Sequence, residues 1–246
     1  MIQHAMENNQ FRLLFQPVIS LRGDSDEHYE VLLRMLNPQG EEVSPNEFIT
    51  EAKAEGLTEK IDRWVVLNSI KLLSEHRSKG HNTKLFVHLS GASLQDQTLL
   101  PWLSVALKAA RLPSDALIIQ FSEPDAIEYL KQAKALTQGL AELHCKVSLT
   151  QFGCAINPFN TLKHLTVDFV KIDGSYTQDL SKPENLESLK VLLASLHSQA
   201  KLTIVPYVET ASTMSTLWQA GVNYIQGYFL QGPSHGMDYE FSSGNE

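Results

Sequence analysis

Eight short apolar runs, rich in β-branched residues and separated by longer helical patterns, constrain the fold of this 246-residue chain more than any other feature. Such alternation is typical of strands joined by crossover helices, and eight is the number of strands that closes a barrel. The runs cover residues 11–19, 28–35, 83–90, 117–122, 146–150, 168–173, 202–208 and 223–229. The sequence therefore predicts an α/β fold of the TIM (β/α)8 barrel type.

The connections modify this barrel at one place. Only LRGDSDEH separates the first two runs, which is too short for a crossover helix, so we expect an antiparallel first strand. No repeat or low-complexity linker divides the chain. We therefore expect one barrel domain over residues 11–233, between a flexible segment at 1–10 and a flexible tail at 234–246. The expected helices cover residues 44–56, 58–80, 99–111, 124–143, 184–199 and 210–220.

Charge and composition exclude several classes of protein. A net charge of −8 and a pI near 5.6 argue against a non-specific DNA or RNA binder, which usually carries a basic face. The two cysteines, Cys145 and Cys154, are too few for a disulfide framework. No apolar stretch approaches the roughly 20 residues of a membrane span. We therefore expect a cytoplasmic protein without direct membrane insertion.

Polar side chains gather at the predicted strand ends, where barrels of this type carry their functional sites. A two-metal hydrolase needs several convergent carboxylates, and only four acids stand here among amides and other groups, which disfavours such a site. The strand-end residues are Arg34, His88, Ser90, Gln120, Glu123, Thr150, Gln151, Lys171, Asp173, Tyr207, Glu209 and Gln226, with Gln16 and Glu30 on the first pair.

Six short motifs occur in the order and spacing of one family, and the chain resembles an EAL domain over residues 11–233. The short first connection agrees with the antiparallel first strand of that family. The motifs are Gln16-Pro17, Glu30-Val31-Leu32-Leu33-Arg34, Phe86-Val87-His88-Leu89-Ser90, Lys171-Ile172-Asp173, Val208-Glu209-Thr210 and Gln226-Gly227-Tyr228.

The resemblance implies a cyclic di-GMP phosphodiesterase fold that has lost its metal ligands. The family's enzymes use Mg²⁺ or Mn²⁺, and Glu30 and Glu209 stand where family acids are kept. Other ligand positions differ: His88 replaces an Asn, Gln120 an acid, Thr150 and Gln151 the paired aspartates, and Pro206 an acid. Hard cations prefer anionic oxygen ligands. We therefore expect no metal, no cofactor and no catalytic residues here.

The ligand-binding half of the pattern is retained. Arg34 offers a fork of donors for a phosphate, and Tyr207 offers a ring for stacking a purine. Gln16, Asp62 and Glu209 suit guanine edges or riboses. The residues expected to bind cyclic di-GMP are Gln16, Glu30, Leu32, Leu33, Arg34, Pro45, Phe48, Asp62, Ser90, Tyr207, Glu209, Gln226, Tyr228, Gly232 and Pro233.

The variant motifs EVL, TQFG and PYVE resemble a member of the family that binds cyclic di-GMP without hydrolysing it. That resemblance implies a PilZ-domain partner and a part in type IV pilus and twitching-motility control. Two other functions stay open. One is a weak metal-dependent phosphodiesterase that uses acids such as Glu30, Glu123, Asp173 and Glu209 with Lys171. The other is an interaction module that ignores the nucleotide.

Plainer structural roles also stay open for five of these residues. Arg34 could be a surface salt-bridge partner. Glu30 could pair with Lys171, and His88 could be an ordinary core histidine. Asp62 could be a solvated helical charge, and Tyr207 could pack against Phe229.

Overall fold

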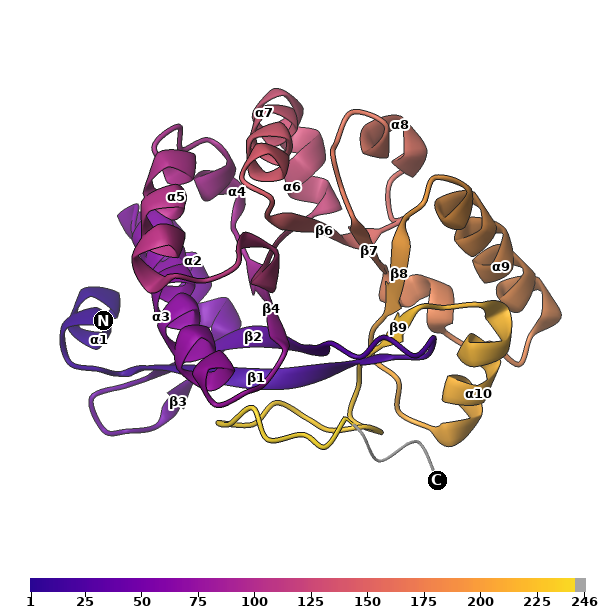
Figure 1. The fold of residues 1–246 in the computed structure, drawn as a ribbon, viewed down its shortest axis with the longest axis horizontal. Coiled ribbons are helices and arrows are strands. Elements are labelled where there is room, and N and C mark those ends of the chain that lie inside the picture. Colours follow the sequence, from indigo (N-terminus) through magenta and orange to yellow (C-terminus); the bar gives the residue numbers. More distant parts are fainter. Residues whose placement is uncertain (242–246) are drawn as a thin grey trace.

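The computed structural model describes residues 1–241 and forms a closed barrel wrapped by helices (Figure 1). The strands are β1 (Phe11–Ser20), β2 (Glu27–Leu36), β3 (Glu42–Val43), β4 (Thr83–His88), β5 (Leu117–Ser122), β6 (Lys146–Phe152), β7 (Phe169–Ile172), β8 (Leu202–Val205) and β9 (Tyr224–Ile225). The helices are α1 (Ile2–Glu7), α2 (Pro45–Glu55), α3 (Thr58–Ser78), α4 (Gly91–Leu94), α5 (Leu99–Ala110), α6 (Glu123–Glu128), α7 (Leu130–Glu142), α8 (Pro158–Leu162), α9 (Pro183–Ser198) and α10 (Ala211–Ala220).

The sheet confirms the predicted barrel and its antiparallel first strand. The strand order is β1-β9-β8-β7-β6-β5-β4-β2-β3, and a further pairing of β1 with β2 closes the ring. Strand β1 runs antiparallel to both of its neighbours, whereas the pairs from β2–β4 round to β8–β9 are parallel. The two-residue β3, which the sequence did not reveal, adds to the edge of β2.

The inside of the barrel is built in two layers because inward-facing residues recur every second position along a strand. His28 packs in the lower layer, with its ring 5.2 Å from Tyr224 and 5.8 Å from Phe86. The other buried residues of the lower layer are the apolar and aromatic Val18, Phe86, Ile118, Phe169, Ile204 and Tyr224, together with Ser148 on β6. Two positions nearer the mouth on each strand stand the polar residues Gln16, Glu30, His88, Gln120, Thr150, Lys171 and Gln226, with Pro206 on the β8 side.

A tight backbone contact sets the end of the last strand. Gly227 follows β9, and a Cβ atom on it would lie 2.2 Å from the carbonyl oxygen of Val208. No side chain fits there. The contact keeps Gln226 and the following Tyr228 against the connection that leaves β8.

Both chain ends differ from the expectation of flexible segments. Residues 2–7 form α1, in which Ile2 and Ala5 are completely buried, so apolar packing orders this end. Ser234 forms a β-bridge with Phe15, and the Tyr239 N–H donates to the Tyr29 hydroxyl over 3.0 Å. Figure 1 shows this yellow segment running alongside β1. The rest of the predicted flexible tail, residues 242–246, lies outside the described residues.

The predicted helix at 124–143 is two helices in the structure. Tyr129 adopts φ −120° and ψ 46°, outside the helical region, and separates α6 from α7. The apolar pattern continues across this break because both helices pack on the barrel. Periodicity alone therefore did not show the division.

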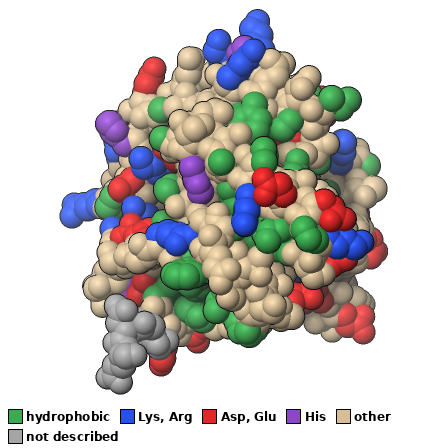
Figure 2. Space-filling model, turned by 90° about the vertical axis from the view of Figure 1, so that its right-hand side faces the viewer, with side chains coloured by type: hydrophobic (Ala, Val, Ile, Leu, Met, Phe, Trp, Pro, Cys, Tyr) green, Lys and Arg blue, Asp and Glu red, His purple; other side chains and the backbone are tan. Residues whose placement is uncertain are grey.

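No helix in residues 1–241 is long and apolar enough to cross a membrane. On the face beside α9 and α10, acidic and basic side chains are interspersed and do not form a single basic field (Figure 2). This distribution agrees with the net charge of −8.

Candidate ligand-binding site

A cavity of about 620 Å³ opens at the mouth of the barrel, above the polar layer. Strands supply its floor, and α2 and α3 supply one wall. Of the residues predicted to bind ligand, those that line the cavity are Gln16, Glu30, Leu32, Leu33, Arg34, Pro45, Phe48, Asp62, Ser90, Tyr207, Gln226 and Tyr228. Chain segments far apart in sequence thus converge on one space of the size that small-molecule sites have.

Three predicted residues stand outside this lining. Glu209 is exposed beyond the rim. Gly232 supports a wall residue, since a Cβ atom there would lie 2.9 Å from the ring of Tyr228. Pro233 follows it at partial exposure. Their contact with a ligand stays a prediction.

The floor of the cavity is organised around Glu30. Its Oε2 atom forms an ion pair with the Lys171 ammonium and accepts a 2.9 Å hydrogen bond from Gln120 Nε2. Burial raises the pKa of Glu30, but the Lys171 charge and these hydrogen bonds outweigh burial and hold the pKa below its ordinary value. The alternative of a Glu30–Lys171 pair is therefore what the structure shows.

Two glutamines close the floor beside β1. Gln226 Nε2 donates to Gln16 Oε1 over 3.1 Å, and Gln16 Nε2 donates to the Gln231 carbonyl over 3.3 Å. The Oε1 atoms of Gln120 and Gln226 are buried and have no hydrogen-bond partner among the described residues. A buried acceptor without a donor is costly. These amides therefore favour a ligand that carries N–H or O–H donors.

Arg34 lies at the carboxyl end of β2. Its Nε atom is 3.1 Å from Glu42 Oε1, and its Nη1 donates to the Leu33 carbonyl over 3.1 Å. Glu42 belongs to β3 and its side chain is 58% exposed. The sequence leaves a surface salt bridge open for Arg34, but it does not identify Glu42 as the partner because a two-residue strand leaves no recognisable pattern.

Asp62 is neither solvated nor free. It is buried on α3, and its Oδ2 atom accepts from the Ser90 N–H at 2.9 Å and from the hydroxyls of Ser90 and Ser93 at 2.6 Å each. Burial raises the pKa of Asp62 although these hydrogen bonds oppose the shift. Asp62 therefore ties α3 to the connection after β4, in addition to lining the cavity.

His88 faces the cavity and is not packed in the core. Its side chain is exposed at the floor. The enclosing barrel wall lowers the pKa of its imidazole, against the opposing charges of Asp62 and Glu30. A neutral His88 is therefore available to a ligand as one donor and one acceptor.

Tyr207 has an unusual backbone for its residue type. Its φ of 63° lies in the left-handed region that favours glycine, and its side chain is 73% exposed at the rim. Gly174 leaves room for the ring, since a Cβ atom there would lie 3.2 Å from Tyr207 Cδ2. The exposure shows that this ring is not packed away.

Glu123 serves a loop and does not line the cavity. It is completely buried, and its carboxylate accepts from the Ala155 N–H at 2.8 Å and the Gly153 N–H at 3.2 Å. Its Oε1 atom also accepts from the Cys154 thiol at 3.3 Å. The side chain thus orders the connection that follows β6.

The geometry defines an α/β barrel with a cavity over a polar floor at the carboxyl end of its strands. The family model described as EAL domain matches residues 1–233, and the chain belongs to this family.

Solved structures and curated proteins resemble the chain over nearly its full length. The FimX EAL domain from Pseudomonas aeruginosa, solved bound to c-di-GMP, is 69% identical with a TM-score of 0.94, covering 98% of each chain. The Xanthomonas citri FimX EAL domain, solved in complex with c-diGMP, is 31% identical with a TM-score of 0.92, covering 98% of this chain and 94% of that one. The Escherichia coli (strain K12) cyclic di-GMP phosphodiesterase PdeF is 30% identical over 94% of this chain but only 31% of its own length. The chain thus spans about a third of that curated relative.

We expect the Glu30–Lys171 ion pair to make the free energy of unfolding depend on pH in the acidic range. Because the pKa of Glu30 is below its ordinary 4.5 in the folded protein, its stabilisation is complete above pH 4.5 and is lost as pH falls through the folded-state pKa. Glu30→Gln leaves Lys171 buried without its partner and should cost about 3–5 kcal/mol at pH 7. Urea unfolding should show that the difference in free energy of unfolding between wild type and Glu30→Gln becomes smaller as the pH is lowered from neutral. Glu55→Gln, which changes an exposed acid, is the control. A difference between wild type and Glu30→Gln that does not change with pH would contradict a stabilising Glu30–Lys171 ion pair.

Proposed function

We propose that this chain is a receptor domain that binds cyclic di-GMP in the barrel mouth, does not hydrolyse it, and signals the bound state to a protein partner. The observation that carries the proposal is that three kinds of group line one cavity. These are the Arg34 guanidinium, the two glutamine amides at the floor whose oxygens lack hydrogen-bond donors, and two exposed tyrosines. The similarity to two FimX EAL domains solved with this ligand supports it.

Arg34 is the phosphate-binding group in this proposal. A guanidinium binds phosphate through two parallel charge-assisted hydrogen bonds. Its present partner, Glu42, is mostly exposed, and such surface pairs contribute little. A phosphate can therefore replace Glu42 at small cost, whereas the contact with the Leu33 carbonyl holds the side chain near the mouth.

In this proposal, the guanine bases stack on tyrosine rings and donate hydrogen bonds to glutamine amides. Tyr207 and Tyr228 are 73% and 72% exposed at the rim, which leaves their faces open for stacking. Guanine carries N–H donors at its edge, and the buried Oε1 atoms of Gln120 and Gln226 lack donors. The apolar wall from Phe48 and Leu32 covers the rest of the ligand.

The same residues do not fit a pair of catalytic cations. Glu30 is engaged by Lys171 and Gln120, and Glu123 accepts from the N–H groups of Gly153 and Ala155 and from the Cys154 thiol. Within residues 1–241, the groups of three or more potential metal ligands are Glu27/His76/His81 and Asp24/Asp26/His28, and neither lies at the mouth. The other acids that line the cavity are Asp62, Asp125 and Asp173; Asp62 accepts from Ser90 and Ser93, and Asp173 accepts from the N–H and hydroxyl of Ser175. Two hard cations need several free and convergent carboxylates.

A PilZ-domain protein is the partner we propose, in type IV pilus and twitching-motility control. This part rests on the resemblance of the EVL, TQFG and PYVE motifs and on the similarity to FimX. It also implies a cytoplasmic location. Affinity for a purified PilZ-domain protein, compared with and without the nucleotide, separates a receptor from a nucleotide-independent interaction module.

We expect calorimetry in EDTA to show cyclic di-GMP binding with a Kd of about 1 μM or tighter, or roughly −8 kcal/mol. No metal is needed because the phosphate partner is a guanidinium. Incubation with Mn²⁺ should give no linear pGpG. The similarity to PdeF makes a weak phosphodiesterase the competing function. Steady turnover would establish that function, and loss of binding in EDTA would exclude the metal-free receptor.

We expect Arg34→Ala to weaken cyclic di-GMP binding by about 1.5–3 kcal/mol, or roughly 10- to 150-fold, because it removes a charge-assisted fork. Arg34→Lys keeps the charge but not the fork, and should recover only part of the loss. Arg22→Ala is the matched control, since Arg22 bonds the Trp218 carbonyl at the other end of the barrel. Equal affinity of Arg34→Ala and wild type would show that the phosphate lies elsewhere.

We expect Tyr207→Gly to separate binding from stability. The variant loses a stacked base, worth about 1–3 kcal/mol of binding. Glycine also relieves the left-handed backbone at this position, which costs other residues about 1–2 kcal/mol. Calorimetry should therefore show weaker binding while thermal unfolding shows no loss of Tm. A fall in Tm with unchanged affinity would mean that Tyr207 packs and does not stack.

A further inference from the structure

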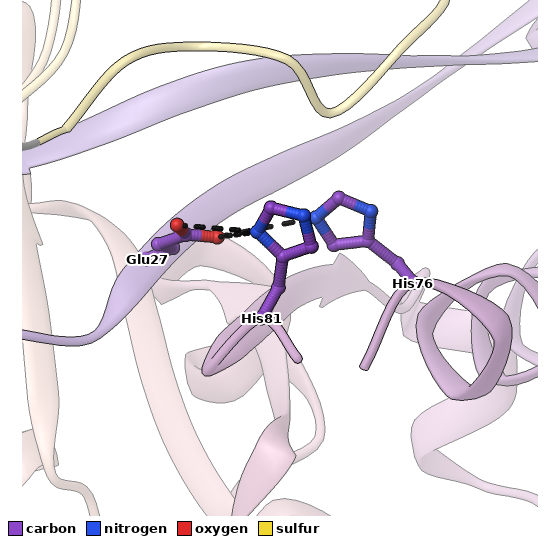
Figure 3. Close-up of side chains that lie close together, drawn as sticks. All are labelled: Glu27, His76 and His81. Carbon is purple, nitrogen blue, oxygen red and sulfur yellow. Dashed lines mark hydrogen bonds and ion pairs between the residues drawn. The ribbon is translucent and has the colours of Figure 1, made fainter. Parts of the chain in front are cut away.

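A second cluster of ligating side chains lies at the end of the barrel opposite the mouth. Glu27 is the first residue of β2 and is paired with Thr83, the first residue of β4. His76 lies in the last turn of α3, and His81 lies in the connection from α3 to β4. Figure 3 shows both imidazoles turned toward the Glu27 carboxylate.

The distances suit a single small cation. His81 Nδ1 is 3.3 Å from Glu27 Oε2, and His76 Nε2 is 3.9 Å from the same oxygen. The ligand atoms of the three residues all lie within 4.8 Å of one another. In a tetrahedral zinc site, with bonds of about 2.0–2.2 Å, neighbouring ligand atoms lie about 3.3–3.6 Å apart. Each imidazole nitrogen must also direct its in-plane lone pair at the ion, so binding would require one of the two stacked rings to rotate.

His76 has a buried nitrogen without a partner. Its Nε2 atom is shielded from solvent and makes no hydrogen bond with a described residue, and 3.9 Å to Glu27 is too long for one. Buried polar atoms normally have a hydrogen-bond partner. A buried nitrogen that lacks one, close to a carboxylate, indicates that a further group binds between the two. A metal ion would satisfy it.

Neighbouring groups hold the cluster in place. The Thr83 hydroxyl donates to Glu27 Oε2 over 2.9 Å, and a hydrogen bond of this kind fixes a carboxylate ligand in metal sites. The two imidazoles stack with centroids 4.0 Å apart and 10° between planes, so His81, the more exposed of the two, is the ring that would turn to bind the ion. The nearby cations have other partners: Lys79 pairs with Glu75, and Arg77 donates to the Thr83 carbonyl.

We propose that Glu27, His76 and His81 form a binding site for one borderline transition-metal cation, with Zn²⁺ as the first candidate. Two imidazoles and one carboxylate favour such an ion over Mg²⁺, which prefers oxygen ligands. The His81 side chain is 43% exposed, so an ion can enter from solvent and keep water as its fourth ligand. The ion would join the start of β2 to α3 and to the α3–β4 connection. This site is independent of the function proposed for the mouth.

The test uses tag-free protein stripped with EDTA and then dialysed. Calorimetric titration with Zn²⁺ should show one ion bound per chain, with Mg²⁺ unable to compete. His76→Gln and His81→Gln should each weaken binding by tenfold or more, whereas exposed His164→Gln should not change it. At one hundred times the Kd, Zn²⁺ should raise the wild-type Tm by roughly 5–10 °C. The Tm of each variant in EDTA reports whether it folds.

Titration with Co²⁺ separates this site from the two cysteines. Ligand-field bands without a thiolate charge-transfer band are the expected spectrum. A charge-transfer band would place the ion at Cys145 or Cys154 and overturn the proposal. Absence of saturable binding, or equal affinity in wild type, His76→Gln and His81→Gln, would overturn it as well.

Discussion

Closure of the barrel through β1 is the constraint on which the rest of the structure depends. This strand runs antiparallel to both neighbours, and its register with β2 places Gln16 opposite Glu30 and Val18 opposite His28. A shift of one residue would turn every inward side chain outward. The correct register instead sets an apolar and aromatic layer beneath a polar one, and the polar layer becomes the floor of the cavity.

The polar layer is held together by paired side chains. Lys171 and Glu30 neutralise one another in a buried position, and each would be costly there alone. Gln120 donates to Glu30, and Gln16 accepts from Gln226. The Glu30 and Lys171 charges on this floor are therefore paired, and Arg34 lies at the rim with its mostly exposed partner Glu42.

The two ends of the barrel have different chemistry because different chain segments build them. Long connections and the wall from α2 surround the mouth, which gives it depth and apolar surface. The opposite end brings Glu27, His76 and His81 together, and His76 also lines a separate cavity of about 400 Å³ bordered by β1 and α3. Their separation along β2 allows a ligand at one end and an ion at the other without competition.

The sequence by itself determined the barrel and its antiparallel first strand, because strand periodicity and connection length are local signals. Most of the residues predicted to line the cavity came from the resemblance of the motifs to EAL domains. Packing alone decided the rest. The pairing of Arg34 with Glu42 needed an unpatterned two-residue strand, and Asp62 became a buried acceptor only through Ser90 and Ser93. The Glu123 carboxylate binds the loop after β6 and does not face the cavity, and α1 packs on the protein by burying Ile2 and Ala5. These outcomes depend on contacts between residues distant in sequence, which no local pattern records.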